Sequence, residues 1–257
     1  MAGDSRDLHG EVARLDAEID AHPGTLAREH FEELRRAWDV FDNAARNLYA
    51  LLVGPNEDPD LITEIMHWKG KRGRAYQQAL DSAVQASVAG SSALIEVVRR
   101  IVRGQSDQFQ LDFAARKAAM LSAGPEAGFW KGFRNYLLHR GHAPWQISTP
   151  FTATTIDLKV HLHASQLLLW DGWNTATRAW LVNQETVEVA PVLFSYRAGM
   201  YDLHFWLMEH LLVVHTAEID ASNDLIRRRN LLLTGGHYDD QASFMGAVER
   251  SLSDGTA

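Results

Sequence analysis

The sequence predicts a mainly α-helical bundle with a small β-hairpin insertion near residues 150–170. Three observations lead to this fold class. Apolar residues recur at alternating steps of three and four along several long stretches of the chain. Gly-Pro or Pro-Gly pairs, which commonly mark helix ends, separate several of these stretches. The apolar period changes to two only in a short segment around residue 160, and that alternation is typical of a half-buried strand.

The N-terminal part of the chain is expected to form helices. A short helix covers residues 8–19 and a long amphipathic helix covers 31–52, because apolar residues keep helical spacing through both. A further helical piece starts at Pro59, and the basic, Gly-containing run 69–74 is expected to interrupt it as a loop or frayed turn. A second long helix then extends over residues 80–102.

Two shorter helices follow. We expect one from Phe109 to Leu121 and one from about Glu126 to Arg140, because Pro125 suits a first helical turn. Gly141 follows the second helix directly and is placed to be its C′ cap, since glycine adopts the left-handed conformation at low cost.

The remaining elements include the expected β insertion. Apolar residues alternate with polar ones from 156 to 163, and the apolar run 166–170 is expected to pair with this strand as a hairpin. Residues 174–183 are expected to be helical, 187–191 to be a short extended piece, and 192–233 to be one long or kinked helix.

The chain is expected to form a single helical domain. It would extend over residues 1–234, with a core over about 25–145 that the long helix 192–233 completes. Residues 235–257 are polar and are expected to be a flexible tail.

Composition excludes several classes of site. The 257 residues include no cysteine, which rules out disulfide frameworks, thiolate metal sites and cysteine nucleophiles. The net charge is −8, but residues 1–60 carry 14 acidic and 6 basic side chains, whereas residues 61–257 carry 19 of each. The acidic excess therefore lies in the N-terminal segment, and the neutral remainder of the chain is compatible with a nucleic-acid partner.

The sequence gives no sign of secretion or of membrane insertion. The N-terminal residues are charged throughout, and the longest apolar runs are broken by His and Glu well short of a membrane span. We therefore expect a cytoplasmic protein with no membrane partner.

One motif is a candidate functional site, and it lies in the stretch FWKGFRNYLLHRGHAPW over residues 129–145. Arg134 and Asn135 are followed, after three residues, by His139 near the end of the predicted helix. Helical geometry places Asn135 and His139 on one face, and the long side chain of Arg134 reaches toward the same edge. A histidine transfers protons near neutral pH, and an arginine holds a phosphate and offsets its charge. RNA brings its own nucleophile, the 2′-hydroxyl, so these residue types are suited to cleaving RNA without a metal.

The motif resembles the hallmark of the HEPN superfamily. That hallmark is an Arg, four to six residues and a His, often with Asn directly after the Arg, and Arg134, Asn135 and His139 match it. The resemblance implies a metal-independent endoribonuclease with Arg134, Asn135 and His139 as catalytic residues. Two copies of the motif meet across a homodimer in that family, so it also implies a composite active site. Active members often belong to toxin–antitoxin or phage-defence systems, which implies an antitoxin protein as a further partner.

Two alternatives stand beside this hypothesis. A helix-terminal Arg and His also serve simply to bond carbonyl groups and to complement the helix dipole. Some HEPN proteins are non-catalytic modules that bind a protein, nucleotide or RNA partner. The chain also lacks the Tyr that some family toxins carry two residues after the His, because Gly141 stands there, so regulation by modification of that Tyr is not expected.

Basic residues near the motif and elsewhere are candidates for RNA binding. Those beside the motif are Lys131, Arg140 and His142. A second group, flanked by aromatic residues, could hold a phosphate backbone or form an ordinary solvated turn, and consists of Lys69, Lys71, Arg72 and Arg74.

We expect no metal and no cofactor. The histidines of the last long helix lack the spacing of four that a helical zinc site requires. His161 and His163 share one face of the predicted strand, and an exposed polar face is the preferred interpretation of that pair. The sequence contains no phosphate-binding loop, dinucleotide fingerprint or G-x-S-x-G nucleophile motif.

Overall fold

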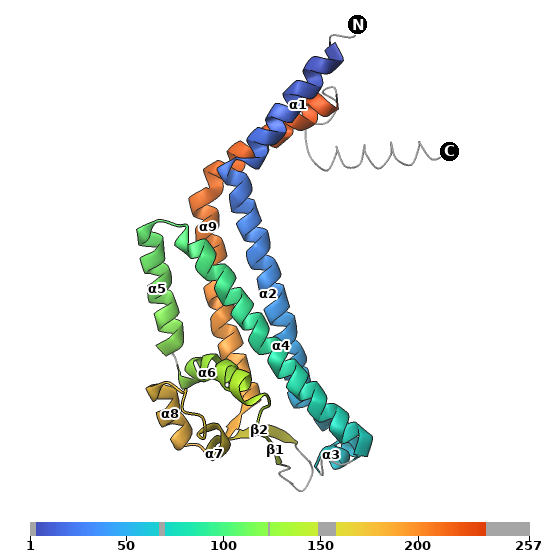
Figure 1. Ribbon diagram of the computed structural model, residues 1–257, viewed down its shortest axis with the longest axis vertical. Coiled ribbons are helices and arrows are strands. Elements are labelled where there is room, and N and C mark those ends of the chain that lie inside the picture. Colours follow the sequence, from blue (N-terminus) through green and yellow to red (C-terminus); the bar gives the residue numbers. More distant parts are fainter. Residues whose placement is uncertain (1–3, 67–69, 123, 149–157, 235–257) are drawn as a thin grey trace, which may run out of the picture. The chain divides into compact units, whose positions relative to one another are not determined.

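The computed structural model describes residues 4–66, 70–122, 124–148 and 158–234. The fold is mainly α-helical with one small antiparallel sheet, as the sequence predicts (Figure 1). The elements in chain order are α1 (Asp4–Asp20), α2 (Pro23–Val53), the 3-10 helix η1 (Gly54–Glu57), α3 (Pro59–Met66), α4 (Gly70–Arg103), α5 (Asp107–Ser122), α6 (Pro125–Arg140), β1 (Trp145–Ser148), β2 (Lys159–His163), α7 (Ala164–Leu167), α8 (Thr175–Val182), β3 (Thr186–Glu188) and α9 (Val189–Leu233).

The chain divides into two compact units. The first contains residues 1–33 and 208–257, and the second contains residues 34–207. Helices α2 and α9 each contribute one part to each unit. The expectation of a single domain over residues 1–234 stays a prediction.

In the first unit, α1 and the start of α2 pack against the end of α9. Its small core contains Leu15 and Ile19 from α1 together with Leu225 from α9. Gly24 permits a close helix contact, because a Cβ atom there would stand only 2.0 Å from the backbone oxygen of Glu218. Polar bonds complete this unit, and they link Arg28 to Ser222 and Asn223, Thr25 to Ser222, and Arg229 to Asp16.

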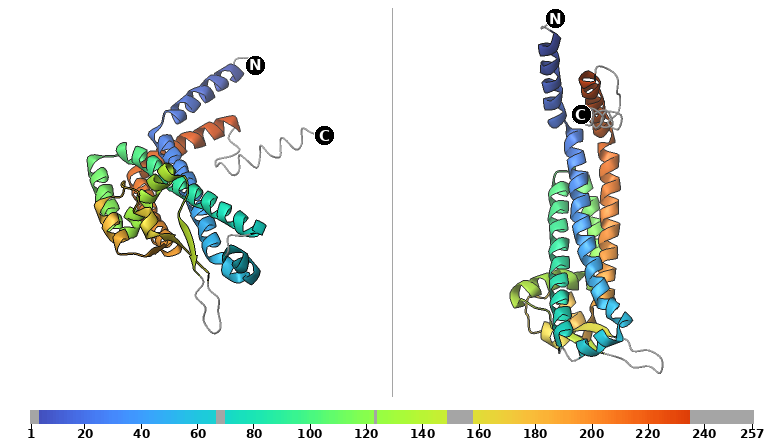
Figure 2. Two further views of the ribbon diagram at one scale, coloured as in Figure 1. Left: turned by 60° about the horizontal axis from the view of Figure 1, so that its bottom comes forward. Right: turned by 90° about the vertical axis from the view of Figure 1, so that its right-hand side faces the viewer.

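The second unit is a helical bundle that holds the predicted site. Figure 2 shows α4 beside its part of α2, and the shorter elements α6, α7 and α8 gather near the sheet. Gly90 of α4 permits the close approach to α2, since a Cβ atom there would lie 3.0 Å from the Cα of Phe41. Phe41 is fully buried, and so are Leu80 and Leu94 of α4. The apolar stripes that predicted the long helices therefore form this core.

The sheet differs from the predicted hairpin. β2 is the central strand and pairs with β1, where Trp145 lies opposite Leu162, and with β3, where Leu162 lies opposite Val187. The prediction that residues 166–170 form its hairpin partner is wrong, because the chain turns into helix α7 directly after β2. The two strands that pair with β2 come from elsewhere in the chain, because β1 precedes β2 and β3 follows α8. Helix α7 instead packs Leu167 into the core.

The basic run 69–74 was expected to interrupt a helix, and this expectation is wrong for residues 70–74. Helix α4 begins at Gly70 and continues without a break to Arg103. Gly70 has φ +75°, which lets the chain turn into the helix, and Gly73 is buried within it, so packing outweighs the low helix propensity of glycine. Lys69 lies outside the described residues, as do the start of the predicted strand and the tail 235–257.

The other predicted helices are confirmed, and their ends agree within a few residues except at the start of α2, which begins at Pro23 rather than near residue 31. They correspond to α1, α2, α5, α6, α8 and α9. Val187 lies in the short strand β3, but α9 already begins at Val189, so only the first part of the extended piece 187–191 is extended.

Candidate functional site

Helix α6 carries the motif and is defined by strong local signals. Pro125 occupies its first turn, and Gly141 caps its end with φ +78° while its N–H donates to the carbonyl of Leu137 at 2.8 Å. This confirms the predicted cap. The helix buries one broad aromatic face, formed by Phe129, Trp130, Phe133 and Tyr136.

Two glycines bring α6 close to the segment that connects β2 to β3. A Cβ atom at Gly128 would stand 2.9 Å from Oγ1 of Thr177, and one at Gly132 would stand 2.7 Å from the indole ring of Trp173. These glycines are one turn apart and lie on one face of α6. The indole of Trp173 is held in turn, because its Nε1 donates to the carbonyl of Leu167 at 2.7 Å.

A series of contacting aromatic rings extends from Trp173 to His139, the last residue of the motif. Trp173 stacks on Phe129 with ring centroids 5.4 Å apart and meets Trp170 edge-on at 5.0 Å. The imidazole of His139 lies 6.0 Å from the ring of Trp170. His139 is therefore positioned at the exposed end of a packed aromatic cluster.

Helix α4 fixes the turn between α6 and β1. The indole Nε1 of Trp145 donates to the carboxylate of Asp81 at 2.8 Å. One turn further along α4, the side-chain amide of Gln85 donates to the carbonyl of Gly141 at 3.3 Å. These two bonds secure the chain directly after the motif.

The three motif residues are all exposed in the second half of α6. Arg134, Asn135 and His139 lie at its surface, and the prediction that His139 stands near a helix end rather than in a core is confirmed. The helix turns about 100° per residue, so Arg134 and His139 point about 140° apart, whereas Asn135 and His139 differ by only about 40°. Arg134 accordingly lines a cavity, while His139 faces Trp170.

The neighbouring basic residues have different surroundings. The guanidinium of Arg140 donates to the carbonyl of Leu169 at 2.9 Å, which ties the end of α6 to the loop after α7. Lys131 is exposed and lines the same cavity as Arg134. His142 is exposed in the turn before β1.

Three members of the second basic group, Lys71, Arg72 and Arg74, lie on the first turns of α4 and apart from the motif in the sequence. Lys71 and Arg74 are exposed. Arg72 is paired, with its guanidinium 2.6 Å from the carboxylate of Asp58 and 3.6 Å from that of Glu64. The backbone N–H of Leu61 and then the side chain of Arg72 lower the pKa of Asp58. Arg72 is therefore already engaged with carboxylates.

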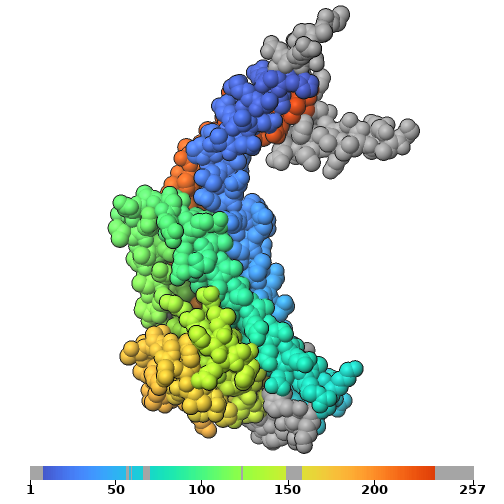
Figure 3. All heavy atoms as spheres, in the orientation of Figure 1, coloured from blue at the N-terminus to red at the C-terminus, as the bar shows by residue number. Residues whose placement is uncertain are grey.

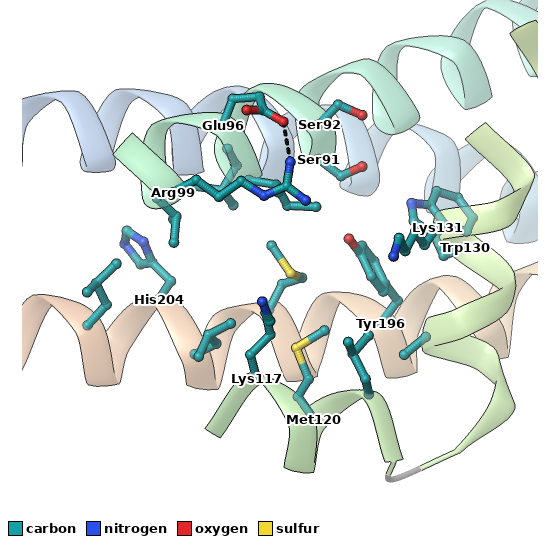
Figure 4. Close-up of a pocket in the computed structure, with 18 of the residues that line it drawn as sticks. Ser91, Ser92, Glu96, Arg99, Lys117, Met120, Trp130, Lys131, Tyr196 and His204 are labelled. Atoms are coloured by element: carbon teal, nitrogen blue, oxygen red, sulfur yellow. Dashed lines mark hydrogen bonds and ion pairs between the residues drawn. The ribbon is translucent and has the colours of Figure 1, made fainter. Parts of the chain in front are cut away.

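The sequence did not reveal the cavity that Arg134 and Lys131 line. It lies in the second unit between α4, α5, α6 and α9, and we call it the four-helix cavity (Figure 4). Its volume is about 150 Å³. Figure 3 views the molecule from the side on which α4, α5 and α6 lie in front. A hint existed in the sequence, since residues 127, 130, 131 and 134 share one helical face, but the facing helices could not be read from it.

Two histidines are more buried than their sequence context indicated. The interpretation of His161 and His163 as an exposed pair is wrong, because His161 is only 5% exposed, packed in the centre of the sheet. Burial lowers the pKa of His161, and it also lowers that of His204, whose ring stacks on Trp38 at 5.0 Å. Among the residues that the structure describes, no three His, Asp or Glu side chains gather as a metal site would require.

Comparison with models of known families, with curated proteins and with solved structures finds no significant match. In the described parts of the chain, no helix is both long enough and apolar enough to cross a membrane. The functional interpretation therefore depends on the residues of the site themselves.

Proposed function

We propose that this chain is a metal-independent endoribonuclease of the HEPN type. The observation that carries the proposal is the exposure of Arg134, Asn135 and His139 together on the last turns of one well-anchored helix. The side chain of Arg134 is exposed, so its guanidinium is accessible to a phosphate. Exposed charged groups on a rigid element suit a site that receives a large polyanion.

The chemistry follows from the residue types. His139 takes the proton of the RNA 2′-hydroxyl, whose oxygen then bonds to the adjacent phosphorus as the bond from phosphorus to the 5′-oxygen breaks. The departing 5′-oxygen takes a proton from water, the resulting hydroxide is neutralised by the proton held on His139, and the products are a 2′,3′-cyclic phosphate and a 5′-hydroxyl end. Arg134 offsets the charge that develops on the phosphate, and Asn135 orients the imidazole from the same face of α6.

Helix geometry favours a site completed by a second copy. Because Arg134 and His139 point about 140° apart on α6, one protomer presents them to different sides. A two-fold pairing of two α6 ends would bring Arg134 of one protomer toward His139 of the other. We therefore propose a homodimer with composite active sites.

The test measures cleavage of single-stranded RNA with and without a chelator. Wild-type protein is expected to cleave in both conditions, and His139→Ala and Arg134→Ala are expected to lose cleavage while keeping their circular dichroism spectra. Lys159→Ala is the control, because Lys159 lies on β2 rather than on α6 and its side chain is 50% exposed. Intact RNA after incubation with wild-type protein would overturn the proposal.

The second candidate is a non-catalytic module that binds a protein partner. It is favoured by apolar surface beside the motif, where Leu138 is 72% and Leu169 is 63% exposed. This candidate predicts a stable complex that Leu169→Asp weakens and no RNA cleavage at any pH from 6 to 8. A toxin or phage-defence role with an antitoxin partner belongs to the first candidate and is tested by toxicity on expression, which Arg134→Ala is expected to relieve.

A further inference from the structure

The four-helix cavity has an apolar interior. Its walls include the buried residues Leu94, Phe113, Met200, Leu203 and Leu207, which come from α4, α5 and α9. An apolar cavity of about 150 Å³ has room for a group the size of a benzene ring. The interior therefore suits a ring or a short acyl chain rather than a nucleotide or a peptide.

The entrance to this cavity is positively charged. Four exposed basic side chains from three helices line it, and these are Arg99, Lys117, Lys131 and Arg134. Glu96 is the acidic residue of the lining, and it pairs with Arg99 at 2.6 Å. Figure 4 shows the nitrogen atoms of Arg99, Lys117 and Lys131 extending around the cavity. Four cations and one carboxylate leave a net positive charge at the mouth of an apolar chamber.

A buried polar atom in the wall lacks a partner. Trp130 is only 1% exposed, and its indole Nε1 has no hydrogen-bond acceptor among the described residues. A buried donor without an acceptor is costly, and a bound molecule commonly supplies the missing partner. Trp130 stacks on Tyr196 with centroids 5.8 Å apart, and Figure 4 places both beside the cavity. Burial raises the pKa of Tyr196 to about 12, so its hydroxyl keeps its proton at neutral pH.

We propose that the four-helix cavity binds a small apolar acid, namely a ring-sized or short-chain body that carries one carboxylate. The body lies among the buried apolar side chains. The carboxylate faces Lys117, Lys131 and Arg134 at the entrance, and one of its oxygens accepts a hydrogen bond from Nε1 of Trp130. This inference does not depend on RNA cleavage.

Isothermal titration of the full chain tests this proposal with defined probes. Phenylacetate is compared with 2-phenylethanol, which has a similar body without charge, and with acetate, which has the charge without the body. Phenylacetate is expected to bind at least about tenfold more tightly than either, because both apolar burial and a charge-assisted hydrogen bond contribute. Equal affinity for phenylacetate and either comparison molecule would overturn the proposal.

Two variants locate the binding site. Lys117→Gln is expected to weaken phenylacetate binding several-fold, which is roughly the effect of losing one charge-assisted contact. Lys117 lies outside the proposed RNA site. Ala127→Leu adds bulk inside the cavity, which Ala127 lines, and is expected to abolish binding. Lys159→Gln is the control, since Lys159 lies on β2 and pairs with Glu188. If Ala127→Leu does not fold, Lys117→Gln decides, and unchanged affinity in Lys117→Gln would contradict the proposal whether or not RNA is cleaved.

Discussion

The contact between Gly132 and Trp173 predicts a change in the free energy of unfolding whose sign should reverse when Trp173 is replaced. Replacement of Gly132 by Ala would normally stabilise a helix by about 1 kcal/mol. Here the new Cβ would stand 2.7 Å from the Trp173 ring, which is 6% exposed and is held by Phe129, Trp170 and a bond to Leu167. Overpacking of this kind costs about 3 kcal/mol at its upper range, so Gly132→Ala is expected to lower the free energy of unfolding by about 2 kcal/mol.

The effect should reverse when the indole is removed. In a Trp173→Leu background the clashing ring atoms are gone, and Gly132→Ala is expected to stabilise by about 1 kcal/mol, which gives a coupling energy of about 3 kcal/mol. Urea unfolding followed by near-ultraviolet circular dichroism measures all four proteins, and the slope with urea checks that the transition itself is unchanged. A neutral or stabilising Gly132→Ala in the wild-type background, or additive effects of the two changes, would refute this explanation of how α6 is positioned.

Three further predictions concern stability and assembly. Gly141→Ala is expected to cost about 1 kcal/mol in urea unfolding because φ is +78° at the cap, and Gly141→Asn is expected to cost less; equal effects would contradict the role of the left-handed cap. Burial lowers the pKa of His161 and His204 in the folded state, so the unfolded chain binds more protons as the pH falls through about 6.5, and stability decreases there. Each of His161→Gln and His204→Gln is expected to reduce this dependence of stability on pH by up to about 1.4 kcal/mol per pH unit. Thermal melts at pH 7.5 and 5.5 measure it, and a difference as large in the variants as in wild type would refute the prediction. Mixing inactive Arg134→Ala and His139→Ala proteins is expected to restore about a quarter of wild-type RNA cleavage, since half of the dimers would be mixed and each would hold one intact composite site; no recovery despite exchange of protomers would contradict the composite site.

The helices could be predicted because their signals are local. The limits of α6 follow from Pro125 and Gly141, and each acts through its own backbone conformation. The start of α4 was missed for the opposite reason, because Gly73 is buried in the bundle and packing outweighs its weak helix propensity. Strand pairing was also missed, since the partners of β2 lie before and after it in sequence and the neighbouring run 166–170 gives no sign that α7 begins at Ala164.

The candidate site was predictable only in part. A helix-end position for His139 follows from Gly141, and the structure confirms it. The cavity beside Arg134 depends on which faces of four helices meet, and side-chain spacing along one helix cannot supply that information. The unpaired Nε1 of Trp130 and the burial of His161 likewise result from packing between segments that are distant in sequence.

Cleavage of RNA by purified protein tests the central claim most directly. Wild-type protein and the Lys159→Ala control are expected to convert single-stranded RNA into fragments with 2′,3′-cyclic phosphate and 5′-hydroxyl ends, in the presence of chelator as well as in its absence. His139→Ala, folded and of the same oligomeric state, is expected to leave the RNA intact. Cleavage by His139→Ala at the wild-type rate, or no cleavage by wild-type protein, would contradict the assignment of His139 as the group that transfers the proton.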